Sequence, residues 1–425
     1  MSNPFSSLSI SDASYAFVLE CEKKLAPYFA QINEVEETNQ SRVLAAFGSE
    51  GVAARHFAQT NGYGYDDIGR DTLDRVFARA LCAEDAIVRP NFVSGTHAIF
   101  TALAGLMKAG DTMLAASGKP YDTLERAIGI VGDEYGSLKN LGVNYKQIEL
   151  DKNGKIDVEA VINSMNDSVK VVYVQRSRGY AWRDSLLPQE MERLFMEVHK
   201  NYPDAITVVD NCYGEFTTPA EPTVFGADVI IGSLIKNPGG GIAPTGGYIA
   251  GKKRFIEQIA NRLTVPGIGR EVGSYAASYE PFFHGLFMAP HTTAQALKSA
   301  MLFGCVFETI GMETMPRLGA VRSDIVQSVK MGGPVPLVAL CQAIQRVSPI
   351  DSNVVPEPWD MPGYNTQVIM AAGAFVQGSS IELSADAPIC EPYIVYIQGA
   401  LTYVHGKIGV MAALDEMVRK KEIRL

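Results

Sequence analysis

The stretch ITVVDNCYGEF (206–216), followed shortly by DVIIGSLIKNPGGG (228–241), decides the fold. Each part begins with a short run of aliphatic, largely β-branched residues. Asp210 ends the first run, and Lys236 follows the second. Runs of this kind are typical of parallel strands that are buried on both faces. Such sheets bind ligands beyond the carboxyl ends of their strands, where these two residues are expected.

Short apolar strands alternate with amphipathic helices on either side of this stretch. The alternation predicts an α/β fold, with a mostly parallel sheet flanked by helices. The further strands are expected at Ala86–Pro90, Thr112–Ala116, Asn144–Leu150 and Lys170–Gln175, and the helices at Thr96–Ala109, Asp157–Asn166 and Pro188–Asn201.

Three regions are expected along the chain. Residues 1–75 form a helical segment and a Gly/Tyr-rich loop at Asn61–Arg70, residues 76–290 a large α/β domain, and residues 291–425 a smaller α+β domain. A new helix is expected to begin at Asp71. The last region is expected to hold a long helix at His291–Phe307, short strands at Thr366–Met370 and Ser380–Leu383, and a final helix.

The composition excludes several classes of protein. The chain has 425 residues, 47% of them hydrophobic, and a formal net charge of −10. A core of ordinary size is therefore possible, while nucleic acid and anionic membranes are not expected partners. Six scattered cysteines and the lack of a recognisable signal sequence favour the cytoplasm. The histidines form no metal-binding motif, so no metal site is expected.

The segment SGTHA (94–98) follows a strand and opens a helix. Ser94, Gly95 and Thr96 would expose free N–H groups at the positive end of the helix dipole, which is a seat for a phosphate. An ordinary capped helix start has the same appearance, so this segment alone leaves both interpretations open.

Asp210 and Lys236 add two further groups. A carboxylate at the end of a buried strand needs a partner, which could be a protonated pyridine nitrogen, a magnesium ion, a helix N-terminus or simply a turn that it caps. Lys236 lies between an apolar strand and a glycine run, a setting that favours a nucleophilic amine over a solvated one.

The order of the three groups is more informative than each alone. Pyridoxal phosphate (PLP) requires three groups of this kind. A phosphate-binding site holds its phosphate, a carboxylate pairs with its ring nitrogen, and a lysine binds its aldehyde. Tyr121, in GKPYDT (118–123), follows the next strand and is the best candidate to stack on the cofactor ring.

Several longer stretches carry a resemblance to a known family. The segments at 94–129 and 226–251 resemble the cofactor-binding parts of fold-type I PLP enzymes of the cystathionine and methionine lyase class. Nearly the whole chain resembles the bacterial methionine γ-lyase-like, or aluminium-resistance, family. The stretches that carry this likeness are YGYDDIGRDTLDRVFA, VQRSRGYAWRDSL, VVDNCYGEF and EPYIVYIQGALTYVHGK.

The resemblance implies a seven-stranded sheet of the fold-type I kind and a role for each candidate residue. Lys236 would be linked to the cofactor and would remove the α-proton of the substrate, and Asp210 would pair with the ring nitrogen. Tyr121 would stack on the ring and could assist proton transfer. The residues expected to bind the phosphate are Ser94, Gly95, Thr96 and Ser233.

The resemblance also implies a homodimer or homotetramer with shared active sites. Tyr63 or Tyr65, with Arg70, would complete the phosphate site of the neighbouring subunit, although their spacing differs from the usual one. Cys390 stands where the family has a basic residue before Glu-Pro-Tyr. Arg176 and Arg178 are therefore the candidate clamps for the substrate carboxylate.

The function implied is a PLP-dependent carbon–sulfur lyase that acts on a cystathionine-type or methionine-type amino acid by β- or γ-elimination. Other reactions of the same cofactor, such as transamination or decarboxylation, remain open. A non-catalytic stress-response protein that keeps a cofactor site is a further alternative. A nicotinamide dehydrogenase is disfavoured, because no GxGxxG follows the first strand.

Overall fold

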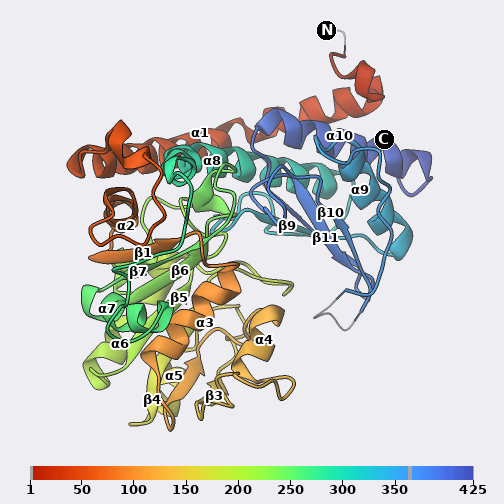
Figure 1. Cartoon of the computed structure of the whole chain (residues 1–425). Helices are drawn as coiled ribbons and strands as arrows, with labels where there is room; N and C mark the ends of the chain where they lie inside the picture. Colours follow the sequence, from red (N-terminus) through yellow and green to blue (C-terminus); the bar gives the residue numbers. More distant parts are fainter. Residues whose placement is uncertain (1–2, 362–365, 425) are drawn as a thin grey trace.

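A computed structural model describes residues 3–361 and 366–424 of the chain. Two sheets lie side by side, and the long helices α1 (Asp12–Ser49) and α8 (Glu280–Thr309) run along the same edge of both (Figure 1). No helix within the described ranges is long and apolar enough to cross a membrane.

The first sheet has seven strands in the order β1-β7-β6-β5-β4-β2-β3. All are parallel except β7, which pairs antiparallel with both β1 and β6, so the expectation of a mostly parallel sheet is confirmed. The strands are β1 (Asp85–Arg89), β2 (Thr112–Ala115), β3 (Asn144–Gln147), β4 (Val169–Gln175), β5 (Ile206–Asp210), β6 (Val229–Ser233) and β7 (Gly247–Gly251).

Helices cover both faces of this sheet, because alternate strand residues point to opposite sides. Val172, Val209 and Ile230 pack with the helices of one face, and Val171, Val208 and Ile231 with those of the other. The first face is covered by α2 (Ile68–Ala80), α5 (Val158–Ser164), α6 (Glu192–Asn201) and the start of α8, and the second by α3 (Gly95–Leu106), α4 (Asp122–Ile128) and α7 (Lys253–Leu263).

The second sheet has five antiparallel strands in the order β10-β11-β12-β9-β8. It shares one apolar core with α1, α8, α9 (Pro334–Arg346) and α10 (Tyr403–Arg419). The strands are β8 (Thr314–Met315), β9 (Val326–Lys330), β10 (Val368–Ala371), β11 (Ser384–Pro388) and β12 (Ile394–Gln398).

Some expected boundaries differ from the structure. Helix α2 begins at Ile68 rather than Asp71, because Asp67 accepts hydrogen bonds from the N–H groups of Gly69 and Arg70 and so caps it. The long helix expected at His291–Phe307 is longer than expected, since α8 begins at Glu280, continues through Pro290 and ends at Thr309.

The strand expected at Ser380–Leu383 is wrong, since β11 begins at Ser384. Glu382 there accepts hydrogen bonds from the N–H groups of Phe375 and Val376, both at 2.9 Å, which ties this segment to a loop.

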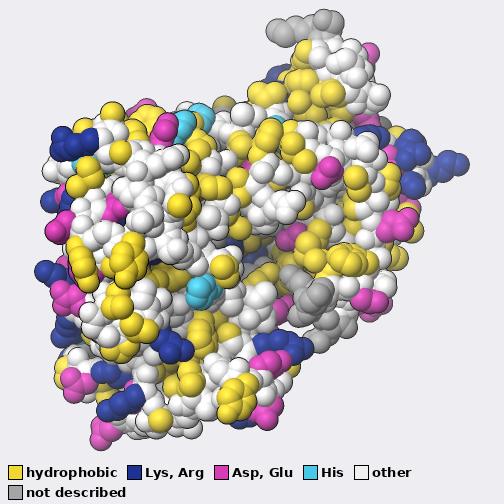
Figure 2. All heavy atoms as spheres, viewed as in Figure 1, with side chains coloured by type: hydrophobic (Ala, Val, Ile, Leu, Met, Phe, Trp, Pro, Cys, Tyr) yellow, Lys and Arg dark blue, Asp and Glu magenta, His cyan; other side chains and the backbone are white. Residues whose placement is uncertain are grey.

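On the face drawn in Figure 2, positive and negative side chains are interspersed around the edge, with hydrophobic side chains between them.

Candidate active site

A cavity of about 210 Å³ lies at the carboxyl ends of the parallel strands. It is lined by residues from β5, the turn after β6, the start of α3 and the segment before α4. Seven of the residues singled out in the sequence line it together: Ser94, Gly95, Thr96, Tyr121, Asp210, Ser233 and Lys236.

The start of α3 forms one wall of this cavity. Ser94 caps the helix, since its Oγ accepts a hydrogen bond of 3.1 Å from the N–H of His97. Gly95 leaves room, because a Cβ there would come within 3.3 Å of the Ser233 Cβ. The Ser233 Oγ is buried and has no hydrogen-bond partner among the described residues. A free hydroxyl beside helix N–H groups suits a phosphate.

Asp210 lies beside Gln175 of β4 and Ile231 of β6 in the sheet register. Its carboxylate accepts hydrogen bonds from the N–H of Cys212 at 3.1 Å and the hydroxyl of Tyr173 at 3.3 Å. Burial raises the pKa of Asp210, although Lys236 and these donors act in the opposite direction. A cation held in the cavity would therefore stabilise the ionised carboxylate.

Lys236 follows β6 in a tight turn that contains Gly240 and Gly241, whose φ angles are 57° and 73°. Its Nζ lies 3.7 Å from the centroid of the Tyr213 ring. Burial lowers the pKa of this amine, but Tyr213, Cys212 and Asp210 together raise it above its usual value. The raised pKa favours the ammonium form, for which the aromatic face of Tyr213 is a suitable neighbour.

Tyr213 is a lining residue that the sequence did not single out. Its φ angle is 70°, which is uncommon for a residue other than glycine. Asn237, next to Lys236, donates hydrogen bonds of 3.0 Å to the carbonyl oxygens of Tyr213 and Glu215, and so ties the two active-site turns together. The only signal in the sequence is its position three residues after Asp210.

Tyr121 stands at the edge of the cavity. Its N–H donates to the Gln175 Oε1 at 2.6 Å, and its ring centroid lies 5.9 Å from that of Tyr180. Together with Gly179 it also lines a neighbouring pocket of about 580 Å³. This larger pocket contains Arg178, which forms an ion pair of 3.3 Å with Asp324 and donates to the Met315 carbonyl oxygen at 2.6 Å.

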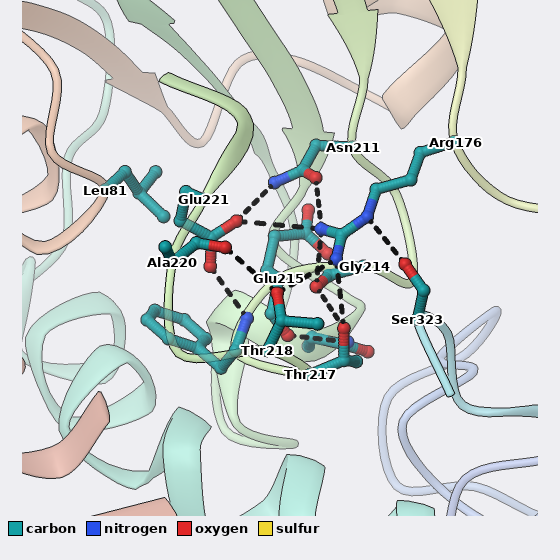
Figure 3. A network of polar contacts seen from close by, with 12 residues as sticks. Leu81, Arg176, Asn211, Gly214, Glu215, Thr217, Thr218, Ala220, Glu221 and Ser323 are labelled. Atoms are coloured by element: carbon teal, nitrogen blue, oxygen red, sulfur yellow. Dashed lines mark hydrogen bonds and ion pairs between the residues drawn. The ribbon is translucent and has the colours of Figure 1, made fainter. Parts of the chain in front are cut away.

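Arg176 is fully buried and lines neither of these two cavities. Its guanidinium points into a ring of oxygens from the turn after β5 and from Ser323 (Figure 3). The donor–acceptor distances are 2.8 Å to Asn211 Oδ1 and to Gly214 O, 3.2 Å to Thr217 Oγ1 and to Thr218 Oγ1, and 3.0 Å to Ser323 Oγ. Since all its guanidinium nitrogens are hydrogen-bonded within the protein, this geometry favours a structural role for Arg176 over binding of the substrate carboxylate.

The residues expected to reach a neighbouring subunit differ in exposure. Tyr63 and Tyr65 are each 73% exposed, whereas Arg70 is fully buried and pairs with Asp71 at 2.8 Å. Of these three residues, therefore, Tyr63 and Tyr65 lie on the surface and Arg70 does not. Cys390 is exposed and does not line the cavity of Lys236.

The model of one family, described as methionine gamma-lyase, matches residues 15–418. The chain belongs to the methionine γ-lyase family. The uncharacterized protein YnbB of Bacillus subtilis (strain 168) is 46% identical over 420 residues, which are 99% of this chain and 100% of YnbB.

Solved structures agree with this family assignment. A carbon–sulfur lyase involved in aluminium resistance from Clostridium novyi NT is 48% identical, with a TM-score of 0.94 over 97% of this chain and 98% of that one. The PLP-dependent protein YhfS of Escherichia coli is 18% identical, with a TM-score of 0.59 over 92% of this chain and 97% of that one. The second likeness shows the fold, which is that of fold-type I PLP enzymes.

Proposed function

We propose that this family member is a PLP-dependent carbon–sulfur lyase that acts on a sulfur amino acid of the cystathionine or methionine type. One observation carries the proposal. A single cavity brings together a lysine amine, a buried carboxylate, an aromatic ring and a helix N-terminus beside a serine hydroxyl that has no partner within residues 3–361 and 366–424. These groups match the aldehyde, ring nitrogen, ring face and phosphate of the cofactor.

The residues present fit the cofactor. Lys236 would hold its aldehyde, Asp210 its ring nitrogen and Tyr121 one face of its ring. The start of α3 and the Ser233 hydroxyl would hold its phosphate. When bound, PLP supplies an electron sink for the negative charge that develops at the α-carbon of the substrate.

Each of the side chains that line the cavity would have its own role in an elimination. The Lys236 amine, when free and unprotonated, would accept the α-proton as a general base. The Asp210 carboxylate would stabilise the positive charge of the ring nitrogen. The Lys236 amine lies over the ring of Tyr213. Tyr121 is placed between the two cavities and can assist proton transfer to the leaving sulfur of a β- or γ-elimination.

The proposal extends to the assembly. Exposed Tyr63 and Tyr65 stand on a loop that is able to contact a second copy of the chain. We infer a homodimer or homotetramer in which these tyrosines approach the phosphate site of the partner. Sedimentation of the purified protein, with and without Tyr63→Ser and Tyr65→Ser, tests this part separately.

The decisive experiment is an absorption spectrum of the purified protein supplied with PLP. We expect a visible band that changes when cysteine, cystathionine or methionine is added. Lys236→Ala should abolish both the band and turnover, while Lys152→Ala, an exposed lysine, should leave both unchanged. A visible band that persists in Lys236→Ala would overturn the assignment of the lysine.

Product analysis tests the class of reaction. Elimination releases ammonia, a 2-oxo acid and a thiol in equal amounts from a sulfur amino acid. Accumulation of a pyridoxamine form without ammonia would show transamination instead, and the lyase proposal would then fail although the cofactor site stands.

A further inference from the structure

A buried glutamine stands beside the candidate active site. Gln175 is the last residue of β4, is only 4% exposed and is the register neighbour of Asp210. It lines the pocket of about 580 Å³, but it does not line the cavity of Lys236. Any role of Gln175 toward a cofactor in that cavity would therefore act through other residues.

The side-chain amide of Gln175 joins two segments that follow different strands. Its Oε1 accepts a hydrogen bond of 2.6 Å from the N–H of Tyr121, which directly precedes α4. Its Nε2 donates to the carbonyl oxygen of Ser177 at 3.3 Å. Because an amide has an acceptor at one end of its fork and a donor at the other, this one side chain satisfies both backbone groups.

The main chain of Gln175 adds a second link to the same segment. Its N–H donates to the Oγ of Ser117 at 2.8 Å, and Ser117 lies between β2 and Tyr121. The segment from Ser117 to Tyr121 is thus bonded to Gln175 at both of its ends. Since Gln175 pairs with Asp210 in the sheet, these bonds set the position of the Tyr121 main chain relative to Asp210.

Gly179 contacts the ring of Tyr121. A Cβ at Gly179 would lie 3.3 Å from the Cδ2 of Tyr121 and 3.4 Å from the Nε2 of Gln175, and its φ angle is 56°. Glycine is therefore what lets the backbone approach the ring so closely. Tyr121, Ser177 and Gly179 all line the cavity of Lys236. The segment to which Gln175 bonds thus supports the Tyr121 ring at the edge of that cavity.

We propose that Gln175 is a positioning residue for the cofactor: by bonding Tyr121 to the segment of Gly179, it holds the Tyr121 ring where the ring stacks on the cofactor. This inference rests on the proposed function, because it places a PLP ring beside Tyr121. Without the amide, the N–H of Tyr121 and the carbonyl oxygen of Ser177 would each lose a partner. The two segments would then separate, and the stacking contact would weaken.

Binding of a cofactor analogue to the cofactor-free full chain tests this role. The probe is deoxypyridoxine phosphate, which has the ring and the phosphate of PLP but no aldehyde, so that its affinity does not depend on a covalent bond to Lys236. Gln175→Leu should weaken its binding about two- to tenfold, the range expected when an aromatic stacking contact is lost. Exposed Gln189→Leu, the matched control, should bind it as tightly as the native protein does.

A double-mutant cycle separates positioning from a purely structural role. In a Tyr121→Leu background the ring is absent, so Gln175→Leu should cause no further loss of affinity. An equal loss in the two backgrounds overturns the proposal. Urea unfolding of the cofactor-free proteins measures stability separately. Lower stability of Gln175→Leu with native affinity for the probe would show a structural role alone, and would also overturn the proposal.

Gly179→Ala is a second variant, which decides the question if Gln175→Leu does not fold. The added Cβ would crowd the Tyr121 ring while the amide of Gln175 remains. It should therefore weaken binding of the probe in the native background but not in Tyr121→Leu, and native affinity would contradict the proposal. Failure of the native protein to bind the probe is a different outcome, because it would overturn the proposed cofactor itself.

Discussion

The amine of Lys236 lies 3.7 Å from the centroid of the Tyr213 ring, on the side of the cavity formed by the turn after β5. Asn237 fixes this arrangement, since it follows Lys236 directly and its amide donates to the Tyr213 carbonyl oxygen at 3.0 Å. The lysine and the tyrosine therefore come from two different strand ends but are held as one unit. Their relative position depends on the register of β5 and β6.

Replacing Tyr213 tests whether its ring face supports the lysine. Tyr213→Leu removes the ring and should lower kcat/KM by about two- to thirtyfold, the range expected for a cation–π contact. Tyr213→Phe keeps the ring and should stay closer to the native value. Steady-state kinetics of both variants provides the measurement. An equal loss in the two would show that the hydroxyl, and not the ring, is what matters.

Asp210→Asn tests the carboxylate at the end of β5. The amide has nearly the same shape but no charge, so it cannot keep a ring nitrogen protonated, and kcat should fall by about a hundredfold or more. The visible spectrum should show that the cofactor is still bound, which separates chemistry from binding. Asp167→Asn, at an exposed position, is the matched control. Unchanged turnover in Asp210→Asn would remove this residue from the mechanism.

Much of the first sheet could be predicted because its strands are short apolar runs with little competing pattern. Val171, Val208 and Ile231 face one layer of helices while their sequence neighbours face the other, as expected for a sheet covered on both sides. The second sheet was harder. The segment at Ser380–Leu383 alternates polar and apolar residues as a half-buried strand does. The hydrogen bonds that Glu382 accepts from Phe375 and Val376 are contacts that this alternation does not reveal.

The candidate site could be predicted for those residues whose positions follow from the ends of the strands. Asp210 and Lys236 both line the cavity, as the positions of their strands indicate. The surroundings of Arg176 were not predictable, because its partners Ser323 and Thr217 are far from it in the sequence. The aromatic partner of Lys236 was missed because one tyrosine in a turn carries no periodic signal. The roles of these residues toward the cofactor stay predictions.

Arg176→Lys tests whether Arg176 stabilises the fold or binds the carboxylate of the substrate. A lysine keeps the charge but cannot span Asn211, Gly214, Thr217 and Ser323 at once, so the free energy of unfolding should fall by about 2–4 kcal/mol. Urea denaturation measures this loss, and exposed Arg193→Lys serves as the control. A large rise in KM with unchanged stability would instead assign Arg176 to the substrate carboxylate.

Glu215→Gln tests the buried acid behind the active-site turn. Glu215 accepts a hydrogen bond of 2.8 Å from the Tyr248 hydroxyl, its Oε2 has no partner among the described residues, and burial raises its pKa to about 8. The folded protein thus keeps a proton on Glu215 that the unfolded chain releases near its ordinary pKa of about 4.3. Between these two values the folded state binds more protons, so stability from this group is full at low pH and is lost as the pH rises toward 8.

Glutamine mimics the protonated acid, and the variant should therefore be insensitive to this titration. Glu215→Gln should match the native protein at pH 4.5 and should melt several degrees higher at pH 9, a gain on the order of one to a few kcal/mol. Thermal unfolding of both proteins across this range, with exposed Glu34→Gln as the control, makes the comparison. If the difference in melting temperature between Glu215→Gln and the native protein is the same at pH 4.5 and pH 9, then the pKa of Glu215 is not raised by folding, and the proposed titration is wrong.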